Sequence, residues 1–155
     1  MKLKIKQKLL SWFDSYNVYD ENDNIVFTVK GKLSWGHKFV IYDANENEVG
    51  CVREKVMTIM PTFEVFNNGS KIGQVKKKFT FFKPKYFFDL GNYDVNGDIW
   101  ALNYNVTRNG EIVATINEKI FTLTDTYIID TNNEDALNVL LIVLAIDADK
   151  CNDLD

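Results

Sequence analysis

The stretch DALNVLLIVLAIDAD, Asp135–Asp149, decides the fold because it is apolar on every side. Within Ala136–Ile146 every residue except Asn138 is apolar, so a helix made from it has no face to turn toward water. Thr131 and Glu134 have the spacing of a capping box, which predicts that a helix begins here. At 1.5 Å per residue the stretch is about 22 Å long, shorter than the roughly 30 Å hydrocarbon layer of a bilayer. The helix is therefore expected to be buried inside the protein itself.

The chain before this stretch has the alternating pattern of β-strands. From Lys4 to about Asp130 apolar residues recur with a period of two, as in IVFTVKG (Ile25–Gly31) and KFVIYD (Lys38–Asp43). Clusters of Asn, Asp and Gly separate these segments and predict hairpin turns. About twelve strand candidates follow one another in this way, which favours an antiparallel meander.

A weak internal repeat runs through this meander. Each copy has an aromatic residue or valine, then an Asn/Asp/Gly turn, then a strand that often ends in lysine. The copies are YDENDNIVFTVKGK, YDANENEVGCVREK, EVFNNGSKIGQVKKK and NVTRNGEIVATINEK. Each copy is predicted to form one β-hairpin.

Strands and helix together predict an all-β fold with one helix. No other part of the chain has a convincing helical pattern, so a sheet has to bury the helix, by closing around it or by sandwiching it. A helix about 10 Å across needs a barrel wider than an eight-stranded one. We therefore predict a closed antiparallel β-barrel of about twelve strands that encloses the hydrophobic C-terminal helix, as a single domain over residues 1–155. Removal of the helix should unfold the domain.

The overall composition and the motifs do not favour an enzyme. His37 is the only histidine and stands at the start of a strand with no Ser or Cys signature nearby, and no phosphate-binding loop occurs. We therefore predict no catalytic residue and no cofactor. The net charge of −4 does not favour nucleic acid. No apolar segment of a signal peptide follows the first lysines, and Cys51 and Cys151 lack disulfide or zinc spacing, so a cytoplasmic protein is expected.

Two acidic stretches resemble metal sites only in part. DVNGDI (Asp94–Ile99) begins like an EF-hand loop, but Gly97 comes two places early and Asn105 stands where the loop requires Glu, which favours a hairpin turn. Asp147 and Asp149 lie at the negative end of the helix dipole, where acids are mildly unfavourable. Solvated helix-end charges account for most of this tail, and a weak divalent-cation site remains the alternative. We assign no metal site.

The best candidate for function is the basic and aromatic stretch KKKFTFFKPKYFF (Lys76–Phe88). It concentrates positive charge and aromatic rings on a chain whose net charge is negative. Such a stretch can hold anionic lipid headgroups, each basic residue contributing about 1 kcal/mol, while aromatic rings enter the interface. The candidate lipid-binding residues are Lys76, Lys77, Lys78, Lys83 and Lys85.

Two other interpretations account for the same stretch. The aromatic rings would face the core and the lysines would face water, where they guard a sheet edge. Alternatively, lysines and rings would bind the phosphates and bases of a single-stranded nucleic acid, which is the least favoured of the three. The sequence leaves these alternatives open.

The order of segments also resembles the LURP-one-related family. The resemblance is carried by the hairpins of about Val18–Lys78, by GDIWALNYNV (Gly97–Val106), by DTYIID (Asp125–Asp130) and by the helix ending in AIDA (Ala145–Ala148). It covers nearly the whole chain and implies the tubby-like barrel that this family shares with tubby C-terminal domains and phospholipid scramblases. In that barrel twelve antiparallel strands enclose a hydrophobic C-terminal helix.

The resemblance further implies a function. It indicates a non-enzymatic cytoplasmic binding module that acts peripherally at anionic phospholipid or phosphoinositide surfaces, without a transmembrane segment. The alternative is a protein-interaction or scaffold domain with no lipid role.

Overall fold

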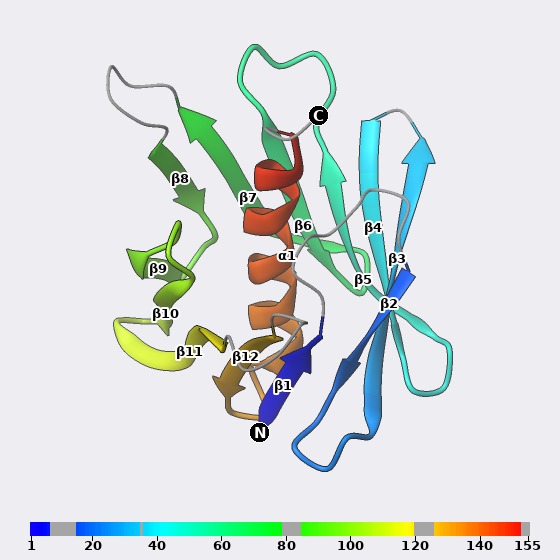
Figure 1. The fold of residues 1–155 in the computed structure, drawn as a ribbon. Coiled ribbons are helices and arrows are strands. Elements are labelled where there is room, and N and C mark those ends of the chain that lie inside the picture. Colours follow the sequence, from blue (N-terminus) through cyan, green and yellow to red (C-terminus); the bar gives the residue numbers. More distant parts are fainter. Residues whose placement is uncertain (7–14, 35, 79–84, 120–125, 153–155) are drawn as a thin grey trace.

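A computed structural model describes residues 1–6, 15–34, 36–78, 85–119 and 126–152 (Figure 1). In the described part the chain forms strands followed by a single helix. The elements are β1 (Lys2–Ile5), β2 (Ser15–Tyr19), β3 (Ile25–Ser34), β4 (Gly36–Asp43), β5 (Glu48–Glu54), β6 (Thr62–Asn67), β7 (Ser70–Lys78), β8 (Lys85–Asp89), β9 (Tyr93–Asp98), β10 (Asn103–Arg108), β11 (Glu111–Lys119), β12 (Thr126–Thr131) and α1 (Ala136–Asn152).

The strands form one antiparallel sheet that curls around α1 (Figure 1). The sheet has 12 strands in the order β8-β7-β6-β5-β4-β3-β2-β1-β12-β11-β10-β9. The predicted fold class, an all-β barrel around one C-terminal helix, is therefore confirmed. The barrel is nearly closed rather than fully closed, because β8 and β9 end the sheet without a ladder of hydrogen bonds between them. Side chains span this seam instead, with the rings of Tyr86 and Trp100 5.8 Å apart.

The helix is the centre of the hydrophobic core. Each residue from Val139 to Ile146 is at most 1% exposed. The helix lies closest to β6 and also contacts β5, β7 and β12. Gly50 on β5 permits this approach, since a Cβ there would lie 2.8 Å from Cδ2 of Leu141. The core side chains that the strands contribute include Leu3, Ile5, Val29, Phe39, Val52, Phe63, Val65, Val75, Tyr104, Val106, Ile116 and Ile129.

The helix begins where it was predicted to begin, but another residue caps it. Asn132 Oδ1 accepts a hydrogen bond from the backbone N–H of Asp135 at 2.7 Å, as an N-cap side chain does. Thr131 instead donates its hydroxyl to the carbonyl oxygen of Val113 at 3.0 Å. The predicted Thr131–Glu134 capping box is therefore wrong, because Thr131 is still the last residue of β12 and its side chain is used by the sheet.

A buried polar network joins the first turn of the helix to three strands. The carboxylate of Asp135, 1% exposed, accepts a hydrogen bond from Tyr93 of β9 and pairs with Arg108 of β10 at 3.1 Å. Asn138 donates to the hydroxyl of Tyr93 at 3.1 Å and accepts from Asn67 of β6 at 2.6 Å. Buried polar groups are costly unless they are paired, so this network fixes the position of the helix along the barrel axis.

The stretch Asp94–Asp98, predicted as a hairpin turn, lies in β9 instead. Gly97 has a φ of 126°, which only glycine adopts easily, and a Cβ there would lie 2.8 Å from the carbonyl oxygen of Asn103. Gly97 therefore allows β10 to approach β9 closely and does not form a tight turn. The turn follows at residues 99–102.

Candidate functional site

The two ends of strands β3 to β8 differ in charge. Along an antiparallel meander, alternate connections lie at opposite ends, so β3, β5 and β7 finish at the end where β4, β6 and β8 begin. This end is at the top of Figure 1, and we call it the lysine-rich end. The exposed or half-buried basic residues toward it are Lys32, Lys38, Arg53, Lys76, Lys78 and Lys85 in the strands and Lys55 in the loop after β5. At the opposite end, the turns before β3 and β5 and the strand residues beside them carry Asp20, Glu21, Asp23, Asp43, Glu46 and Glu48.

Glu54 is an acidic residue among the basic residues at the lysine-rich end of these strands. Its carboxylate lies 2.9 Å from Nδ1 of His37 and accepts a weaker hydrogen bond from the backbone N–H of the same residue at 3.4 Å. The pair joins the start of β4 to the end of β5. His37 therefore lies at a strand end, where the sequence placed it, and is engaged by a neighbouring strand.

Three of the predicted lysines form one patch on the outer face of β7 and β8. Lys78 pairs in register with Lys85, and Lys76 pairs with Phe87. All three lysines are exposed, and Phe87 is 50% exposed between them. The ammonium nitrogen of Lys78 lies 5.0 Å from the centre of the Phe87 ring, within the range of a cation–π interaction. The patch therefore combines positive charge with an accessible aromatic ring.

Lys77 does not belong to this patch. It is 1% exposed and lies on the inner face of β7 with Val75, because successive residues of a strand point to opposite faces. A ligand on the outer surface cannot reach it. Tyr86 and Phe88, on the inner face of β8, are half-buried, so the structure follows the core interpretation for these rings and the surface interpretation for Phe87. Lys83 lies outside the described residues.

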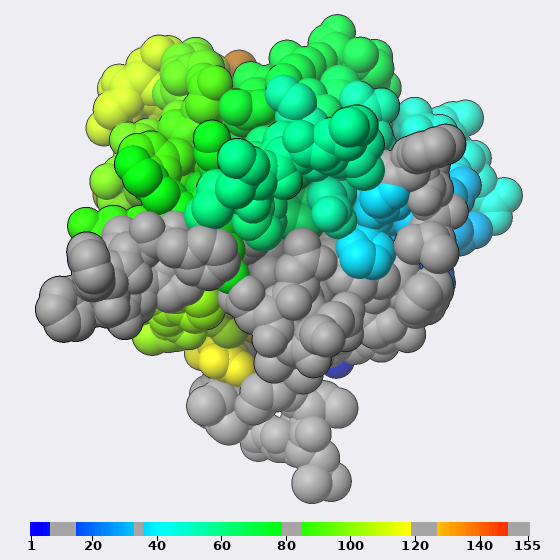
Figure 2. Space-filling model, turned by 90° about the horizontal axis from the view of Figure 1, so that it is seen from above, coloured from blue at the N-terminus to red at the C-terminus, as the bar shows by residue number. Residues whose placement is uncertain are grey.

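The loop between β5 and β6 presents apolar side chains that the sequence analysis missed. Met57 and Ile59 are 101% and 100% exposed, and Val56 is 44% exposed. Figure 2 looks onto this end of the barrel and shows the loop in blue-green at the surface. The available signal was the run VMTIM (Val56–Met60) between two strands, which holds large apolar residues where a polar turn is usual.

This loop is built against the lysine-bearing strand. The backbone N–H of Lys55 donates to the carbonyl oxygen of Thr62 at 2.8 Å, which closes the base of the loop. The N–H of Lys77 donates to the carbonyl oxygen of Pro61 at 3.0 Å, and Thr62 pairs with Lys76. The exposed apolar side chains and the outer lysines therefore lie at the same end of neighbouring strands.

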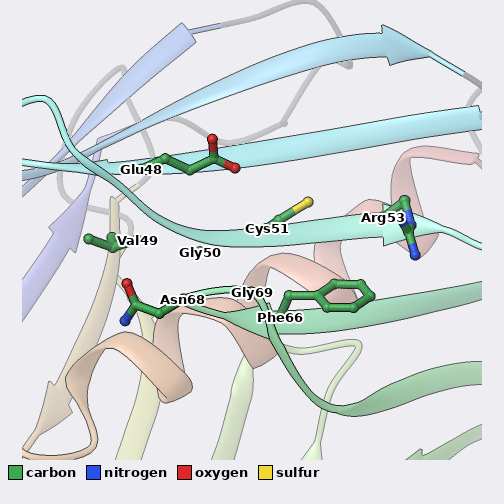
Figure 3. A pocket seen from close by; sticks show the side chains of 8 residues that line it. All are labelled: Glu48, Val49, Gly50, Cys51, Arg53, Phe66, Asn68 and Gly69. Carbon is green, nitrogen blue, oxygen red and sulfur yellow. The ribbon is translucent and has the colours of Figure 1, made fainter.

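A separate hollow of about 530 Å³ lies on the outer wall of β5 and β6 (Figure 3). It forms where the pairing of β4 with β5 shifts register after Ile41. The guanidinium of Arg53 lies 4.8 Å from the centre of the Phe66 ring. Burial raises the pKa of the Cys51 thiol, so this thiol is protonated and weakly nucleophilic at neutral pH. The lining residues are Glu48, Val49, Gly50, Cys51, Arg53, Phe66, Asn68 and Gly69.

Within the described ranges, no group of three or more His, Cys, Asp or Glu side chains is placed to hold a metal ion. Asp147 is 4% exposed, and the side chains of residues 149–155 are outside the description, so the cation alternative for the tail stays a prediction. None of the helices described has both the length and the apolar character needed to cross a membrane.

A family model, a bacterial protein and a solved structure match this chain. The family model described as LURP-one-related matches residues 1–147. A Bacillus subtilis (strain 168) protein, named uncharacterized protein YxjI, is 27% identical over 157 residues that cover 100% of this chain and 97% of the relative. Among solved structures, an Arabidopsis thaliana protein superimposes with a TM-score of 0.59 at 21% identity, over 95% of this chain and 91% of the plant protein. The plant structure supports the fold, and the chain belongs to the LURP-one-related family.

Proposed function

We propose that the protein is a non-enzymatic module that binds anionic membrane surfaces with its lysine-rich end. The observation that carries this proposal is the separation of charge along strands β3 to β8. Lysines gather where β7 ends and β8 begins, whereas carboxylates gather in the turns before β3 and β5. A molecule with a negative net charge of −4 can approach a negative surface only if its positive side faces that surface.

The magnitude of the attraction is sufficient for reversible binding. A basic side chain near an anionic leaflet contributes about 1 kcal/mol. Lys55, Lys76, Lys78 and Lys85 are all exposed at this end, so together they supply on the order of 4 kcal/mol before any apolar contact. This attraction is screened within about a Debye length and therefore weakens as salt is added.

The chemistry of the described side chains favours binding over catalysis. His37 is paired with Glu54, and the Cys51 thiol remains protonated because burial raises its pKa. The lysine patch, by contrast, is open to solvent.

Co-sedimentation with vesicles tests the proposal. Vesicles of phosphatidylcholine with increasing phosphatidylserine should retain increasing amounts of the protein at 50 mM salt, and 500 mM salt should abolish the part of the binding that depends on charge. The variant Lys76→Glu/Lys78→Glu should bind at least about tenfold more weakly, since two favourable contacts of about 1 kcal/mol each become repulsive. The matched control is Lys2→Glu/Lys71→Glu, which changes the net charge equally at the opposite end and should bind like the wild type.

Two outcomes would redirect the proposal. If wild-type protein ignores anionic vesicles at low salt, the lipid role fails and the protein-interaction or scaffold role replaces it. If vesicles containing phosphatidylinositol bisphosphate retain far more protein than phosphatidylserine vesicles of equal surface charge, binding depends on the headgroup as well as on charge. Equal retention at equal charge would exclude the phosphoinositide selectivity that the family resemblance implies.

A further inference from the structure

We propose that the β5–β6 loop, with Val56, Met57 and Ile59 at its tip, inserts into the hydrocarbon boundary of the membrane and anchors the barrel there. This inference rests on the proposed function, because the lysines first bring the loop to the lipid. It adds a second, apolar contribution to the binding and fixes which part of the molecule enters the bilayer.

The exposure of this loop is unusual for a water-soluble surface. Met57 and Ile59 are exposed over their whole side chains, at 101% and 100%, so they contact almost nothing in the barrel. Val56 adds to the same tip at 44%. Isolated apolar residues on a surface are ordinary, but a cluster rimmed by charged residues marks a protein or membrane contact.

The loop is held in this outward conformation by its own bonds. The Thr58 hydroxyl lies 2.8 Å from the carbonyl oxygen of Met60 and 3.2 Å from that of Lys55, and can donate to either. Met57, between them, has a φ of 63°, a left-handed conformation that non-glycine residues adopt mainly in fixed turns. A loop that is already ordered loses little conformational entropy when it inserts.

The base of the loop is anchored as well. Val56 lies over Gly36 at the start of β4, where a Cβ would come within 2.9 Å of Cγ1 of Val56. The Lys55 N–H to Thr62 carbonyl bond closes the two strands below. These contacts keep the tip from folding back onto the barrel wall.

The charge around the loop selects lipid over a second copy of this chain. Lys55 precedes the tip directly, and Lys76 lies on the strand that pairs with Thr62. Two copies meeting through this loop would bring two lysine-rich ends together, and like charges in an interface are costly. An anionic bilayer offers opposite charge at the headgroups and apolar chains below them, in the same order as the lysines and the loop tip.

The test removes the apolar tip and leaves the charge unchanged. Met57→Ser/Ile59→Ser should bind vesicles of phosphatidylserine and phosphatidylcholine at least tenfold more weakly than the wild type at 150 mM salt. It should also lose the fraction of binding that survives 500 mM salt, whereas Lys76→Glu/Lys78→Glu should lose the salt-sensitive fraction. The matched control, Ile25→Ser/Ile112→Ser, removes two exposed apolar residues from strand starts at the opposite end and should bind like the wild type.

Insertion itself is measured by quenching. Met57→Trp should gain fluorescence that bromine-labelled acyl chains quench, above the background of the native tryptophans in wild-type protein, while Ile25→Trp should gain none. If Met57→Ser/Ile59→Ser binds as tightly as the wild type, the insertion inference is overturned although the lysine-based function stands. If the wild type is a dimer by sedimentation equilibrium and only the serine variant is monomeric, the loop is a self-association surface and the inference is likewise overturned. Absence of any wild-type binding removes both proposals.

Discussion

Two buried tyrosines show how much the partner of a single hydroxyl matters in this core. The Tyr93 hydroxyl donates to Asp135 and accepts from Asn138. Tyr104 is 2% exposed, and its hydroxyl has no hydrogen-bond partner among the described residues. The same chemical group is therefore satisfied at one position and unsatisfied at the other.

Phenylalanine substitutions should separate these two cases. Tyr93→Phe should lower the free energy of unfolding by about 1–3 kcal/mol, because it leaves the buried Asp135 carboxylate with one partner fewer. Tyr104→Phe should change it by less than about 0.5 kcal/mol or raise it, since no hydrogen bond is lost. Urea unfolding at neutral pH measures both. Equal losses for the two variants would contradict the assignment of the network.

The same hydroxyl predicts a dependence on alkaline pH. Burial, and then the charge of Asp147, raise the pKa of Tyr104 well above its ordinary value of 10.0. The folded state therefore keeps the proton longer than the unfolded state, so this contribution to stability is complete below pH 10 and is lost as the pH rises from there toward the folded pKa. Tyr104→Phe should lose stability less steeply than the wild type between pH 10 and 11, by at most about 1.4 kcal/mol per pH unit. Parallel unfolding curves for the two proteins would contradict this cause.

At the residue scale, the lysines named from the sequence do not all share one surface: Lys76, Lys78 and Lys85 are exposed, and Lys77 is buried. A period of two places Lys77 opposite Lys76 and Lys78, and Val75 marks the inner face. The alternation was therefore available from the sequence. Which of the two sets of side chains faces the core was not available from the sequence, because it depends on how β7 packs against the helix. The prediction of the helix cap was wrong for a similar reason. Both Thr131 and Asn132 are good cap residues, and the point at which β12 ends decides which of them caps the helix.

At the scale of the element, β7 is shaped by one glycine. A Cβ on Gly73 would lie 2.0 Å from the carbonyl oxygen of Asp89 and 2.7 Å from Cα of Leu90. Both are backbone atoms that cannot rotate away. The chain that leaves β8 therefore crosses β7 so closely that only glycine fits, and this crossing brings Leu90 to its bridge with Tyr93 beside the seam.

Gly73→Ala should consequently loosen this side of the barrel. We expect a loss of about 2 kcal/mol or more in the free energy of unfolding, at the upper part of the range for overpacked cores. Faster amide hydrogen exchange in β8 should accompany it, because the added methyl pushes that strand off β7. The control Ser70→Ala, at an exposed position of the same strand, should stay within about 0.5 kcal/mol of the wild type. A stable Gly73→Ala variant with unchanged exchange would show that the crossing is not tight.

In two segments the local sequence pattern predicts the wrong conformation. Asn and Gly in DVNGD favour a turn, yet β9 runs through them because Gly97 serves the approach of β10. Conversely, the run Val56–Met60 follows the composition of a strand and forms an exposed loop. In β9 a neighbour in space decides the conformation, whereas the loop is held by the local hydrogen bonds of the Thr58 hydroxyl.

For the whole molecule, the internal repeat explains the separation of charge. Each copy places polar or acidic turn residues before a strand and lysine at the end of that strand. In a meander the strands that follow these turns, β3, β5, β7 and β11, all run in the same direction. Their turns therefore gather at one end of the barrel and their lysines toward the other. The repeat in the sequence thus produces the separation of charge in the folded molecule.

The sequence predicted this architecture because the helix allowed few alternatives. An apolar helix too short for a bilayer requires an enclosing sheet, and the chain contains enough strands to close one. The open seam between β8 and β9 was not predictable, because it depends on ring contacts such as Tyr86 with Trp100 and on the crossing at Gly73.

The helix should therefore be indispensable to the whole fold rather than a detachable tail. Truncation after Asp135 would remove the buried residues Val139–Ile146 and expose the apolar inner faces of the strands around them. The truncated chain should show no cooperative unfolding in urea and should aggregate, whereas deletion of residues 153–155 alone should leave the transition intact. Leu141→Ala, a milder change at the same place, should cost about 2–5 kcal/mol in one cooperative transition. A truncated chain that kept strand circular dichroism and a cooperative transition would mean that the barrel supports itself, and its interior would then be open to a ligand.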